Sequence, residues 1–409
     1  MEISIMSKLM LCLCTLLLLV SCNAKDSKHT DTVLFVDLMS VDNLADFKLS
    51  NFGDSVRYVP LETTDSCLIG NDPQIKLLED KIMVVTSKQC LLFDKQTGKY
   101  VCSVGHIGDD PEGYSSTDCS VDDAGFIYFV RLPGQLIKYD QAGQMVGVIE
   151  VPHDPIAPNY FVCSDSIIIG HYSGYMGIST RALVFFDTAG GVKDTIPSLI
   201  PPTSLFHNED IVSFSILRNM DQLGLLAVKG IIIIRYKDQS QLMMAPNDPV
   251  LWKCRDEVRF RESFMDIIYT IRENRLEPYM IFGTRGERLS ASNILSGDPK
   301  AMGVSYVNEN ERLVFFQFIQ GKQVYSGIYD KLKNDTEYAK AQKFIPDDFN
   351  RNFKIEMSTL CSYKDQYGFL VQTGAALNWL DEHPDEVNGE LSFLNQLDEE
   401  ANPIVVIVN

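Results

Sequence analysis

Short apolar stretches separated by turn residues run along most of the chain. Three of them share one pattern: an apolar run ends in an aromatic residue and an aspartate, and turn residues with a glycine follow. They lie at Leu91–Lys99, Leu136–Gln144 and Leu183–Gly191. Their aspartates, Asp94, Asp140 and Asp187, are 46 and 47 residues apart. A fixed period of this size indicates one supersecondary unit copied along the chain.

The apolar pattern predicts short strands with turns between them. The predicted strands are Val56–Leu61, Lys81–Val85, Gln89–Phe93, Tyr100–Val104, Phe126–Val130, Leu136–Asp140, Met145–Val151, Val162–Gly170, Ala182–Asp187, Leu223–Val228, Ile231–Tyr236, Val258–Phe260, Asp266–Ile271, Tyr279–Phe282, Leu313–Phe318, Gln323–Asp330, Gly368–Thr373 and Pro403–Val408. Helical periodicity is scarce, and one short helix is predicted at Val41–Phe47.

The spacing predicts a closed ring of repeated units. From Asp187 to a fourth aromatic–Asp step at Asp330 there are 143 residues, close to three further periods, which gives about six units. We therefore predict an all-β fold, a six-bladed β-propeller of four-stranded antiparallel blades. Such a ring has to close, and we expect Val56–Leu61 and Pro403–Val408 to share a blade. A pair of open sandwiches is the alternative, and it explains the regular spacing less well.

The N-terminal residues look like an export signal. Lys8 precedes the apolar stretch Leu9–Val20, which has the length of a signal peptide and is short for a membrane span. Ser21 and Cys22 follow it and resemble a bacterial lipobox. That implies cleavage before Cys22, a lipid on its thiol and anchoring in the cell envelope, with the outer membrane favoured and its leaflet open. A signal peptide with a chance cysteine is the alternative. Translation can start at Met1 or Met6.

These features divide the chain into a signal peptide at 1–21, a lipidated cysteine and tether at 22–50, and a propeller domain at 51–409. The 36 basic and 55 acidic residues give a net charge of −19, which repels phosphate groups, so no nucleic-acid partner is predicted. Seven cysteines lie beyond Cys22, and none forms a Cys-x-x-Cys motif. We expect buried thiols rather than a disulfide framework, and leave one or two bridges open.

Several segments match a known family. They are Leu49–Phe52, Val56–Thr64, Gly105–Tyr114, Asp266–Tyr269, Leu276–Tyr279, Gly327–Lys331 and Asn402–Val406. Together they resemble the six-bladed β-propeller lipoproteins common in Bacteroidetes, relatives in shape of the NHL-repeat propellers. In the glycine-rich loop of this family, Asp110 replaces a glycine and Glu112-Gly113 inverts the usual order. The resemblance implies the fold and, by association, a glycan-related or other surface-binding role, and it assigns no activity.

One loop gathers groups that suit ligand binding. The segment 105–114 carries a histidine, three carboxylates and a tyrosine: His106, Asp109, Asp110, Glu112 and Tyr114. Carboxylates can bind Ca²⁺ or sugar hydroxyls, and the aromatic ring can stack on a sugar. The spacing is not that of a calcium loop, so no cofactor is predicted and Ca²⁺ remains an alternative without a motif. The structural interpretation is a connection between blades, with the tyrosine packed on the neighbouring blade.

Two further groups have the same two interpretations. His171, Tyr172 and Tyr175 lie in a glycine-rich insertion of the third copy, where exposed rings would stack on sugars and packed rings would complete a hairpin. Arg259 and Arg261 stand out in an acidic chain. Turned inward, they suit a carboxylate ligand such as a uronic acid, and otherwise they pair with neighbouring carboxylates on a solvated strand.

The repeated aspartates have a structural interpretation, because a residue that recurs in every copy suits a turn cap better than a unique site. The sequence has no zinc-binding pattern of histidines, no nucleophile elbow and no phosphate loop, so no catalytic residue and no metal are predicted. We expect a non-catalytic, membrane-anchored propeller that binds a glycan or an envelope protein. A propeller hydrolase or lyase, acting on a glycan or lactone with an axial polar or metal site, is the alternative, and a scaffold in an envelope complex is a third.

Overall fold

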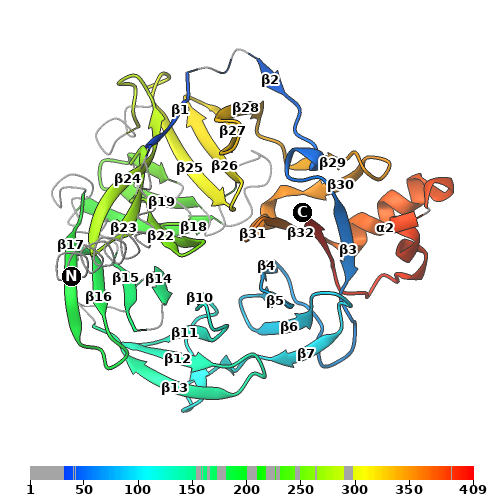
Figure 1. The fold of residues 1–409 in the computed structure, drawn as a ribbon, viewed down its shortest axis with the longest axis horizontal. Helices are drawn as coiled ribbons and strands as arrows, with labels where there is room; N and C mark the ends of the chain where they lie inside the picture. Colours follow the sequence, from blue (N-terminus) through cyan, green and yellow to red (C-terminus); the bar gives the residue numbers. More distant parts are fainter. Residues whose placement is uncertain are drawn as a thin grey trace, which may run out of the picture. The chain divides into compact units, whose positions relative to one another are not determined.

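The computed structural model describes residues 32–39, 41, 43–152, 158, 160–163, 166–172, 181–199, 210–217, 226, 231–244, 249–262, 265–289, 298–387 and 389–409. Leu34–Asn409 forms one compact unit, a ring of six blades of antiparallel strands (Figure 1). The predicted all-β, six-bladed propeller is confirmed. Among the described residues, no helix is long and apolar enough to cross a membrane.

We number the blades along the ring, from the innermost strand of each outward. Blade I comprises β4 (Gln74–Leu77), β5 (Lys81–Val85), β6 (Cys90–Asp94) and β7 (Tyr100–Ser103). Blade II comprises β10 (Cys119–Val121), β11 (Ile127–Arg131), β12 (Gln135–Tyr139) and β13 (Met145–Glu150). Blade III comprises β14 (Tyr160–Cys163), β15 (Ile168–His171), β16 (Arg181–Phe186) and β17 (Val192–Pro197). Blade IV comprises β21 (Leu251–Cys254), β22 (Glu257–Phe260), β23 (Ile267–Arg272) and β24 (Arg275–Gly283). Blade V comprises β25 (Met302–Glu309), β26 (Leu313–Gln320), β27 (Gln323–Asp330) and β28 (Asp335–Lys340).

Blade VI joins the two ends of the propeller unit. It consists of β31 (Cys361–Tyr363), β32 (Gln366–Val371), β33 (Ile404–Val408) and, as its outermost strand, β3 (Val56–Pro60). β3 pairs antiparallel with β33 along its whole length, from Val56 opposite Val408 to Pro60 opposite Ile404. The predicted closure is therefore confirmed. β33 is apolar and fully buried because it pairs on both edges and packs on both faces.

Six apolar clusters show that the ring is continuous. Each cluster lies between two neighbouring blades, so every blade buries both of its faces: blades I and II, II and III, III and IV, IV and V, V and VI, and VI and I. The core is thus a series of interfaces between blades rather than a single centre. This arrangement requires the continuous apolar runs seen in the middle strands of the blades.

An insertion separates blade III from blade IV. It contains a three-stranded sheet of β18 (Ile211–Leu217), β19 (Ile231–Tyr236) and β20 (Gln241–Met244). The apolar cluster between blades III and IV joins them directly, so this sheet is not a seventh blade. The 143-residue interval therefore contains two blades and an insertion rather than three repeats. The predicted total of six is correct, but this step in its arithmetic is not.

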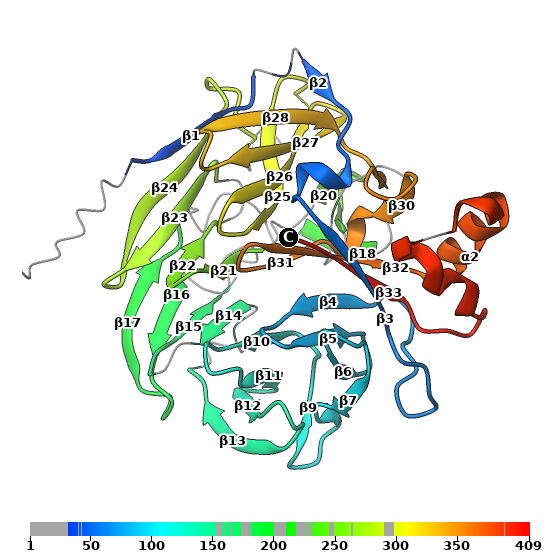
Figure 2. The same cartoon turned by 45° about the vertical axis from the view of Figure 1, so that its right-hand side comes forward.

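The propeller unit begins earlier than the predicted boundary at residue 51. β1 (Leu34–Asp37) adds in parallel to β24 of blade IV, and β2 (Leu44–Ala45) adds in parallel to β28 of blade V. The predicted helix at Val41–Phe47 is wrong: this extended segment passes around the outside of the ring toward β3 (Figure 2).

The remaining elements are short additions to the ring. They are η1 (Leu49–Asn51), β8 (His106–Ile107), β9 (Gly113–Tyr114), β29 (Phe344–Asp347), β30 (Phe353–Glu356), η4 (Met357–Thr359), α2 (Thr373–Glu382), η5 (Pro384–Glu386) and η6 (Gly389–Gln396). α2, η5 and η6 lie between β32 and β33, and the pattern did not predict them. The predicted strand Leu223–Val228 lies outside the described residues, except for Leu226.

The repeated aspartates cap turns, as predicted. Each ends or directly follows the third strand of its blade and accepts backbone N–H groups two to four residues ahead. Asp94 accepts from Thr97, Asp140 from Ala142 and Gln144, Asp187 from Ala189 and Gly191, and Asp330 from Leu332 and Lys333. Such bonds satisfy donors that a tight turn leaves without a backbone partner.

Candidate functional site

The topology brings most of the predicted site residues to one end of the ring. Within a blade the strands alternate in direction, so the turn after the second strand and the connection to the next blade lie at the same end. The loop 105–114 is such a connection, His171 ends the second strand of blade III, and Arg261 directly follows the second strand of blade IV. We call this the connection end and the opposite one the turn end.

The loop 105–114 keeps its carboxylates exposed. β8 and β9 form a short parallel bridge within it, and the imidazole Nε2 of His106 lies 2.6 Å from Oδ2 of Asp110. Asp110 also accepts a hydrogen bond from the backbone N–H of Glu112, at 3.0 Å. The bond with His106 lowers the pKa of the Asp110 carboxyl below its ordinary value. Asp109 and Glu112 are exposed. The loop therefore presents an acidic, solvated rim.

Tyr114 lies at the base of this loop and is fully buried. Its ring stacks on Phe129 with 4.1 Å between centroids, and its hydroxyl donates to the carbonyl of Val104 at 3.0 Å. Tyr139 completes the contact by donating to the carbonyl of Glu112. Burial raises the pKa of Tyr139 to about 12. Tyr114 packs between blades I and II, as the structural interpretation predicts, and shows no exposed face to a sugar.

The predicted aromatic loop of blade III is described in part. His171 and Tyr172 are each 3% exposed, and the Tyr172 hydroxyl donates to the carbonyl of Pro152. The Tyr172 ring belongs to the apolar cluster between blades II and III, so of its two interpretations the packed one is correct for this ring and the exposed one is wrong. Tyr175 lies outside the described residues.

Arg261 is buried, so the predicted solvated strand face is wrong for it. Its side chain is 0% exposed, and Nη1 donates to the carbonyl of Val304 in blade V at 2.7 Å. The neighbouring carboxylate of Glu262 accepts from the hydroxyl of Ser198 at 2.5 Å and from the backbone N–H of Leu199 at 2.6 Å. These two residues therefore connect blade IV to blade V and to the start of the insertion.

Arg259 is also buried, at 4% exposure, and takes part in a charged cluster at the turn end. Its Nη1 lies 2.7 Å from a carboxylate oxygen of Glu257, and its guanidinium carbon lies 3.6 Å from the centroid of the Tyr279 ring. Its Nε is 3.5 Å from Oε2 of Glu309, an ion-pair contact rather than a hydrogen bond. The prediction that Arg259 pairs with Glu257 is confirmed, but in a buried position.

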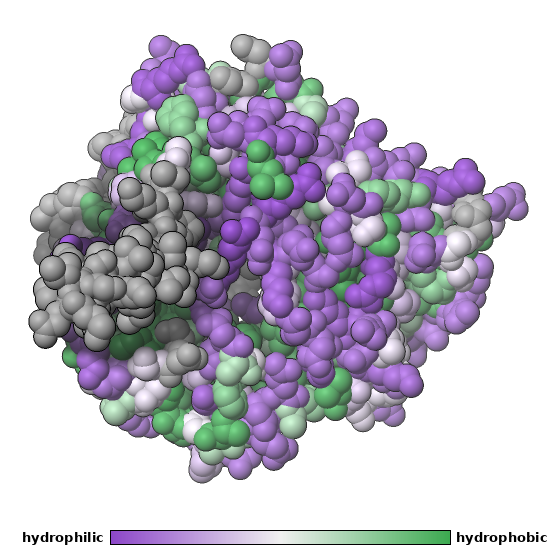
Figure 3. Space-filling view, in the orientation of Figure 1, coloured by the Kyte–Doolittle hydropathy of each residue, from purple (hydrophilic) through white to green (hydrophobic). Residues whose placement is uncertain are grey.

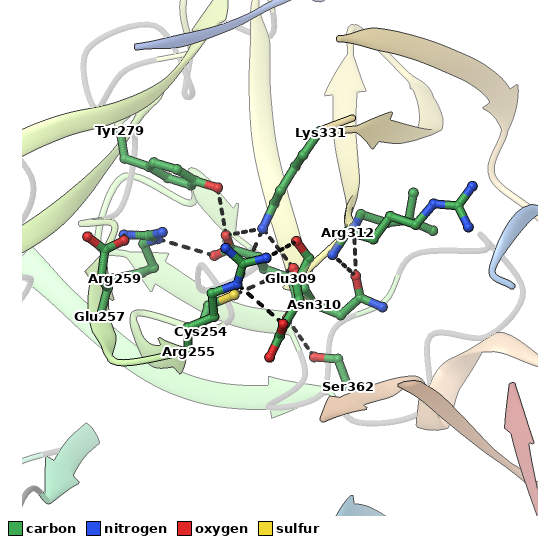
Figure 4. A network of polar contacts seen from close by, with 12 residues as sticks. Cys254, Arg255, Glu257, Arg259, Tyr279, Glu309, Asn310, Arg312, Lys331 and Ser362 are labelled. Atoms are coloured by element: carbon green, nitrogen blue, oxygen red, sulfur yellow. Dashed lines mark hydrogen bonds and ion pairs between the residues drawn. The ribbon is translucent and has the colours of Figure 1, made fainter. Parts of the chain in front are cut away.

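Glu309 is the centre of this cluster (Figure 4). It ends the innermost strand of blade V, and its side chain has no exposed surface. Oε1 accepts from the Lys331 ammonium at 2.7 Å and from the Tyr279 hydroxyl at 2.8 Å, and Oε2 accepts from the indole of Trp252 at 2.8 Å. Three donors and the Arg259 cation, from blades IV and V, therefore surround one carboxylate. This set joins the two blades where their interface is otherwise apolar.

Charge compensation keeps Glu309 ionised. Burial alone would raise the pKa of its carboxyl, but Lys331, Arg259 and the hydrogen bonds from Lys331 and Trp252 together lower the pKa below its ordinary value. Beside it, burial raises the pKa of the Cys254 thiol to about 12. A committed carboxylate and a protonated thiol stabilise the fold; neither is prepared as a general base or a nucleophile.

Glu309 and Lys331 were not among the site residues predicted from the sequence. A signal for both exists in the chain: Glu309 follows Val307 on the buried side of its strand, and Lys331 directly follows the repeated Tyr329-Asp330 step. Lys95 occupies the same place after Asp94, and its ammonium donates to the carbonyl of Leu78 as that of Lys331 donates to Asn310. In two of the four copies, therefore, a lysine after the capping aspartate bonds a carbonyl of its own blade.

Beside blade VI, the described residues also form a polar pocket of about 610 Å³. The start of α2, the segment Leu68–Asp72 and Glu399–Pro403 line it. Asn402 at its base is saturated, since its amide donates to the carbonyls of Glu62 and Cys67 and accepts from Ile69. Among the described residues, no group of three or more His, Cys, Asp or Glu side chains is placed to bind a metal ion. On the face of the ring seen in Figure 1, hydrophilic side chains cover most of the described part and surround a central hollow (Figure 3).

The fold is thus a six-bladed β-propeller, and the buried carboxylate of Glu309 is paired with Arg259 and Lys331 of the same chain. The sequence profile of one family, Domain of unknown function (DUF4934), matches residues 33–409. The chain belongs to this family. No curated protein matches the chain.

Solved structures show likeness in fold. A protein from Bacteroides fragilis NCTC 9343, described as exported, is 17% identical with a TM-score of 0.61, and the match covers 92% of this chain and 99% of that one. A member of the DUF4221 family from Bacteroides vulgatus is 11% identical with a TM-score of 0.40, covering 87% and 98%. At these identities the likeness concerns the fold alone, and the relation to NHL-repeat propellers stays a prediction.

Proposed function

We propose that this chain is a non-catalytic, lipid-anchored propeller of the cell envelope that binds a protein partner at the connection end of its ring. The observation that carries the proposal is the state of its interior charges. Glu309, the most buried carboxylate of the cluster, is held by three hydrogen-bond donors of the chain itself and by the Arg259 cation. Charged groups whose partners all lie in the chain itself stabilise the blades, so the exposed loops are the better candidates for binding a partner.

A protein fits these loops better than a glycan. Sugar binding commonly uses an aromatic ring as a stacking platform, but Tyr114 and Tyr172 are buried between blades. The loop 105–114 instead offers His106, Asp109 and Glu112 beside the half-exposed Ile107, a mixture of charged and apolar surface that suits a protein interface. The signal peptide and Cys22 support a place in the envelope, and the exported protein of B. fragilis is consistent with it.

Site-specific photo-crosslinking in intact cells tests this proposal. A photoreactive amino acid replaces Ile107, which is 43% exposed in the loop, and in a matched control it replaces Leu332, which is 82% exposed at the turn end. We expect one discrete adduct from position 107 and none from position 332. A glycan array probed with the full-length protein in detergent, with and without Ca²⁺, should stay blank. Array binding together with no adduct at position 107 would contradict the proposal in favour of a glycan.

A further inference from the structure

The outermost strands of the six blades differ in how their open edges are protected. An open edge presents unpaired backbone groups, and proteins shield such edges with charges, prolines or covering segments. β1 covers the edge of blade IV and β2 that of blade V. On blade VI, β3 carries Arg57 and Pro60. Three of the six edges are therefore shielded by the N-terminal segment or by residues that oppose pairing.

Two of the other three edges are shielded as well. β17 of blade III carries Lys193, Asp194 and Pro197. β7 of blade I is four residues long, and the backbone N–H of Tyr100 at its start donates to the carboxylate of Glu62 at 2.7 Å. β13 of blade II has neither device: it reads Met-Val-Gly-Val-Ile before Glu150, with no charge or proline in its first five residues.

The pairing of β13 shows which backbone groups face outward. The N–H of Val151 donates to the carbonyl of Gly134, so these two residues form a hydrogen-bonded pair. Counting along the register, Ile149 and Gly147 bond to β12, while Val148 and Glu150 direct their N–H and C=O groups away from it. Near Glu150 a turn of blade III approaches the carbonyl, but a side chain added at Gly147 would meet nothing within 4 Å.

The side chains at this edge are apolar and solvated. Val146 is 49% exposed and Val148 is 41% exposed. In both views of the ring β13 forms the outer rim of blade II, with no described element outside it (Figures 1 and 2). An unpaired, uncharged edge with two exposed valines is the kind of surface that accepts an added strand.

We propose that β13 binds an extended segment of a partner protein as a fifth strand of blade II. This inference rests on the proposed protein-binding function and places part of the partner on the outer edge of blade II, where β13 ends at the connection end. The precedent lies in the same ring, where β1 and β2 add in parallel to the outermost strands of blades IV and V. The segment carries small or β-branched apolar residues at alternate positions and no acidic residue. A second copy is a poorer occupant, because each chain has a net charge of −19 and two copies repel each other.

Amide hydrogen exchange with a defined peptide tests the inference. The probe is the acetylated and amidated peptide Lys-Val-Thr-Val-Thr-Val-Lys, added to the full-length protein in detergent. We expect the outward amide of Val148 to exchange about tenfold more slowly at a peptide concentration ten times its Kd. The same peptide with proline at its central valine should give no protection.

Two matched variants locate the effect. Val148→Pro removes the outward N–H without removing a bond to β12, since proline is tolerated at an open strand edge. It should abolish protection of the other outward amide, that of Glu150, which the substitution leaves in place. Ser103→Pro makes the same change at the outward position of β7, opposite Leu91, and protection of β13 should persist. A thermal melt checks that both variants fold.

Three outcomes would overturn the inference: no protection of β13 by the peptide, unchanged protection in Val148→Pro, or protection that rises with protein concentration alone, which would indicate a second copy. The crosslink at position 107 separates this inference from the proposed function. An adduct that survives in Val148→Pro leaves the partner in place and rejects β13 as its surface. Absence of any adduct contradicts the proposed function itself.

Discussion

The repeated turn glycines allow each blade to pack closely against the blade before it. Gly98, Gly143 and Gly190 have φ angles of +72°, +79° and +81°. A Cβ atom at these positions would lie 2.0, 2.2 and 2.5 Å from a carbonyl oxygen in the outermost strand of the preceding blade, that of Pro60, Ser103 or Glu150. The glycine thus has two reasons to recur, the left-handed backbone and the close approach of a neighbouring strand.

Gly143→Ala should lower the free energy of unfolding by about 2 kcal/mol or more, because it adds backbone strain and a clash with the Ser103 carbonyl. Gly147→Ala, four residues along in the same blade, meets open space and should change stability by less than about 0.5 kcal/mol. Urea denaturation measures both. Equal effects of the two substitutions would contradict the close packing of this turn on the preceding blade.

Glu309→Gln should be among the most destabilising polar substitutions in the chain. It leaves the partly buried Lys331 ammonium without its carboxylate and removes one of the two carboxylates that Arg259 contacts, the other being Glu257. Breaking a buried ion pair by removing one partner costs about 3–5 kcal/mol. Glu311→Gln is the matched control, since its pair with Arg255 is exposed on both sides and contributes less than about 1 kcal/mol. Chemical denaturation at neutral pH distinguishes the two variants.

The same cluster predicts the sign of a pH effect. The pKa of Glu309 is lower in the folded protein than in the unfolded chain, so the unfolded chain binds its proton first as pH falls. Its stabilising contribution is present above the unfolded pKa and is lost as pH falls through the folded pKa. The stability difference between wild type and Glu309→Gln should therefore shrink below about pH 4, near the ordinary glutamate pKa. A constant difference down to pH 2 would contradict the assignment.

At the scale of elements, the apolar pattern predicted where strands lie more reliably than which strands pair with each other. Lys81–Val85 is β5 as predicted, and Tyr100–Val104 differs from β7 by one residue. The helix at Val41–Phe47 was wrong because its apolar spacing also suits an extended segment, and β2 gains its hydrogen bonds from β28, about 300 residues away. Local sequence carries no information on such a partner, and for the same reason the donors that blade IV contributes to Glu309, Trp252 and Tyr279, could not be predicted.

Closure of the ring through β33 predicts a difference between two deletions. Removing Pro403–Asn409 deletes a strand that pairs with both β32 and β3, so blade VI loses its centre and unfolding should lose its cooperativity. Replacing Leu34–Asp37 with glycine and serine removes a strand added to the outer edge of β24 together with the buried Val36, which lowers stability, but cooperative unfolding should persist because every blade keeps its four strands. Thermal unfolding followed by circular dichroism compares them. A sharp transition after the first deletion would contradict closure through blade VI.

For the whole molecule, a regular period fixed the number of blades but not their places in the chain. The insertion holding β18–β20 has nearly the length of one repeat, so Asp330 falls at a distance that suits three blades while only two intervene. Arg261 and Glu262 hold the start of this insertion against blades IV and V. A pattern of spacing cannot separate an inserted sheet from a blade, because only the packing between blades distinguishes them.

The anchoring of the whole molecule gives the last prediction. With a net charge of −19, the chain gains no electrostatic attraction to an anionic membrane surface, so attachment depends on the lipid predicted at Cys22. Cys22→Ser should release the protein from the membrane fraction and remove the lipid from its intact mass. Cys12→Ser, a change within the predicted signal peptide, should leave both unchanged. A Cys22→Ser protein that still sediments with membranes would show that the propeller itself, rather than the lipid, carries the attachment.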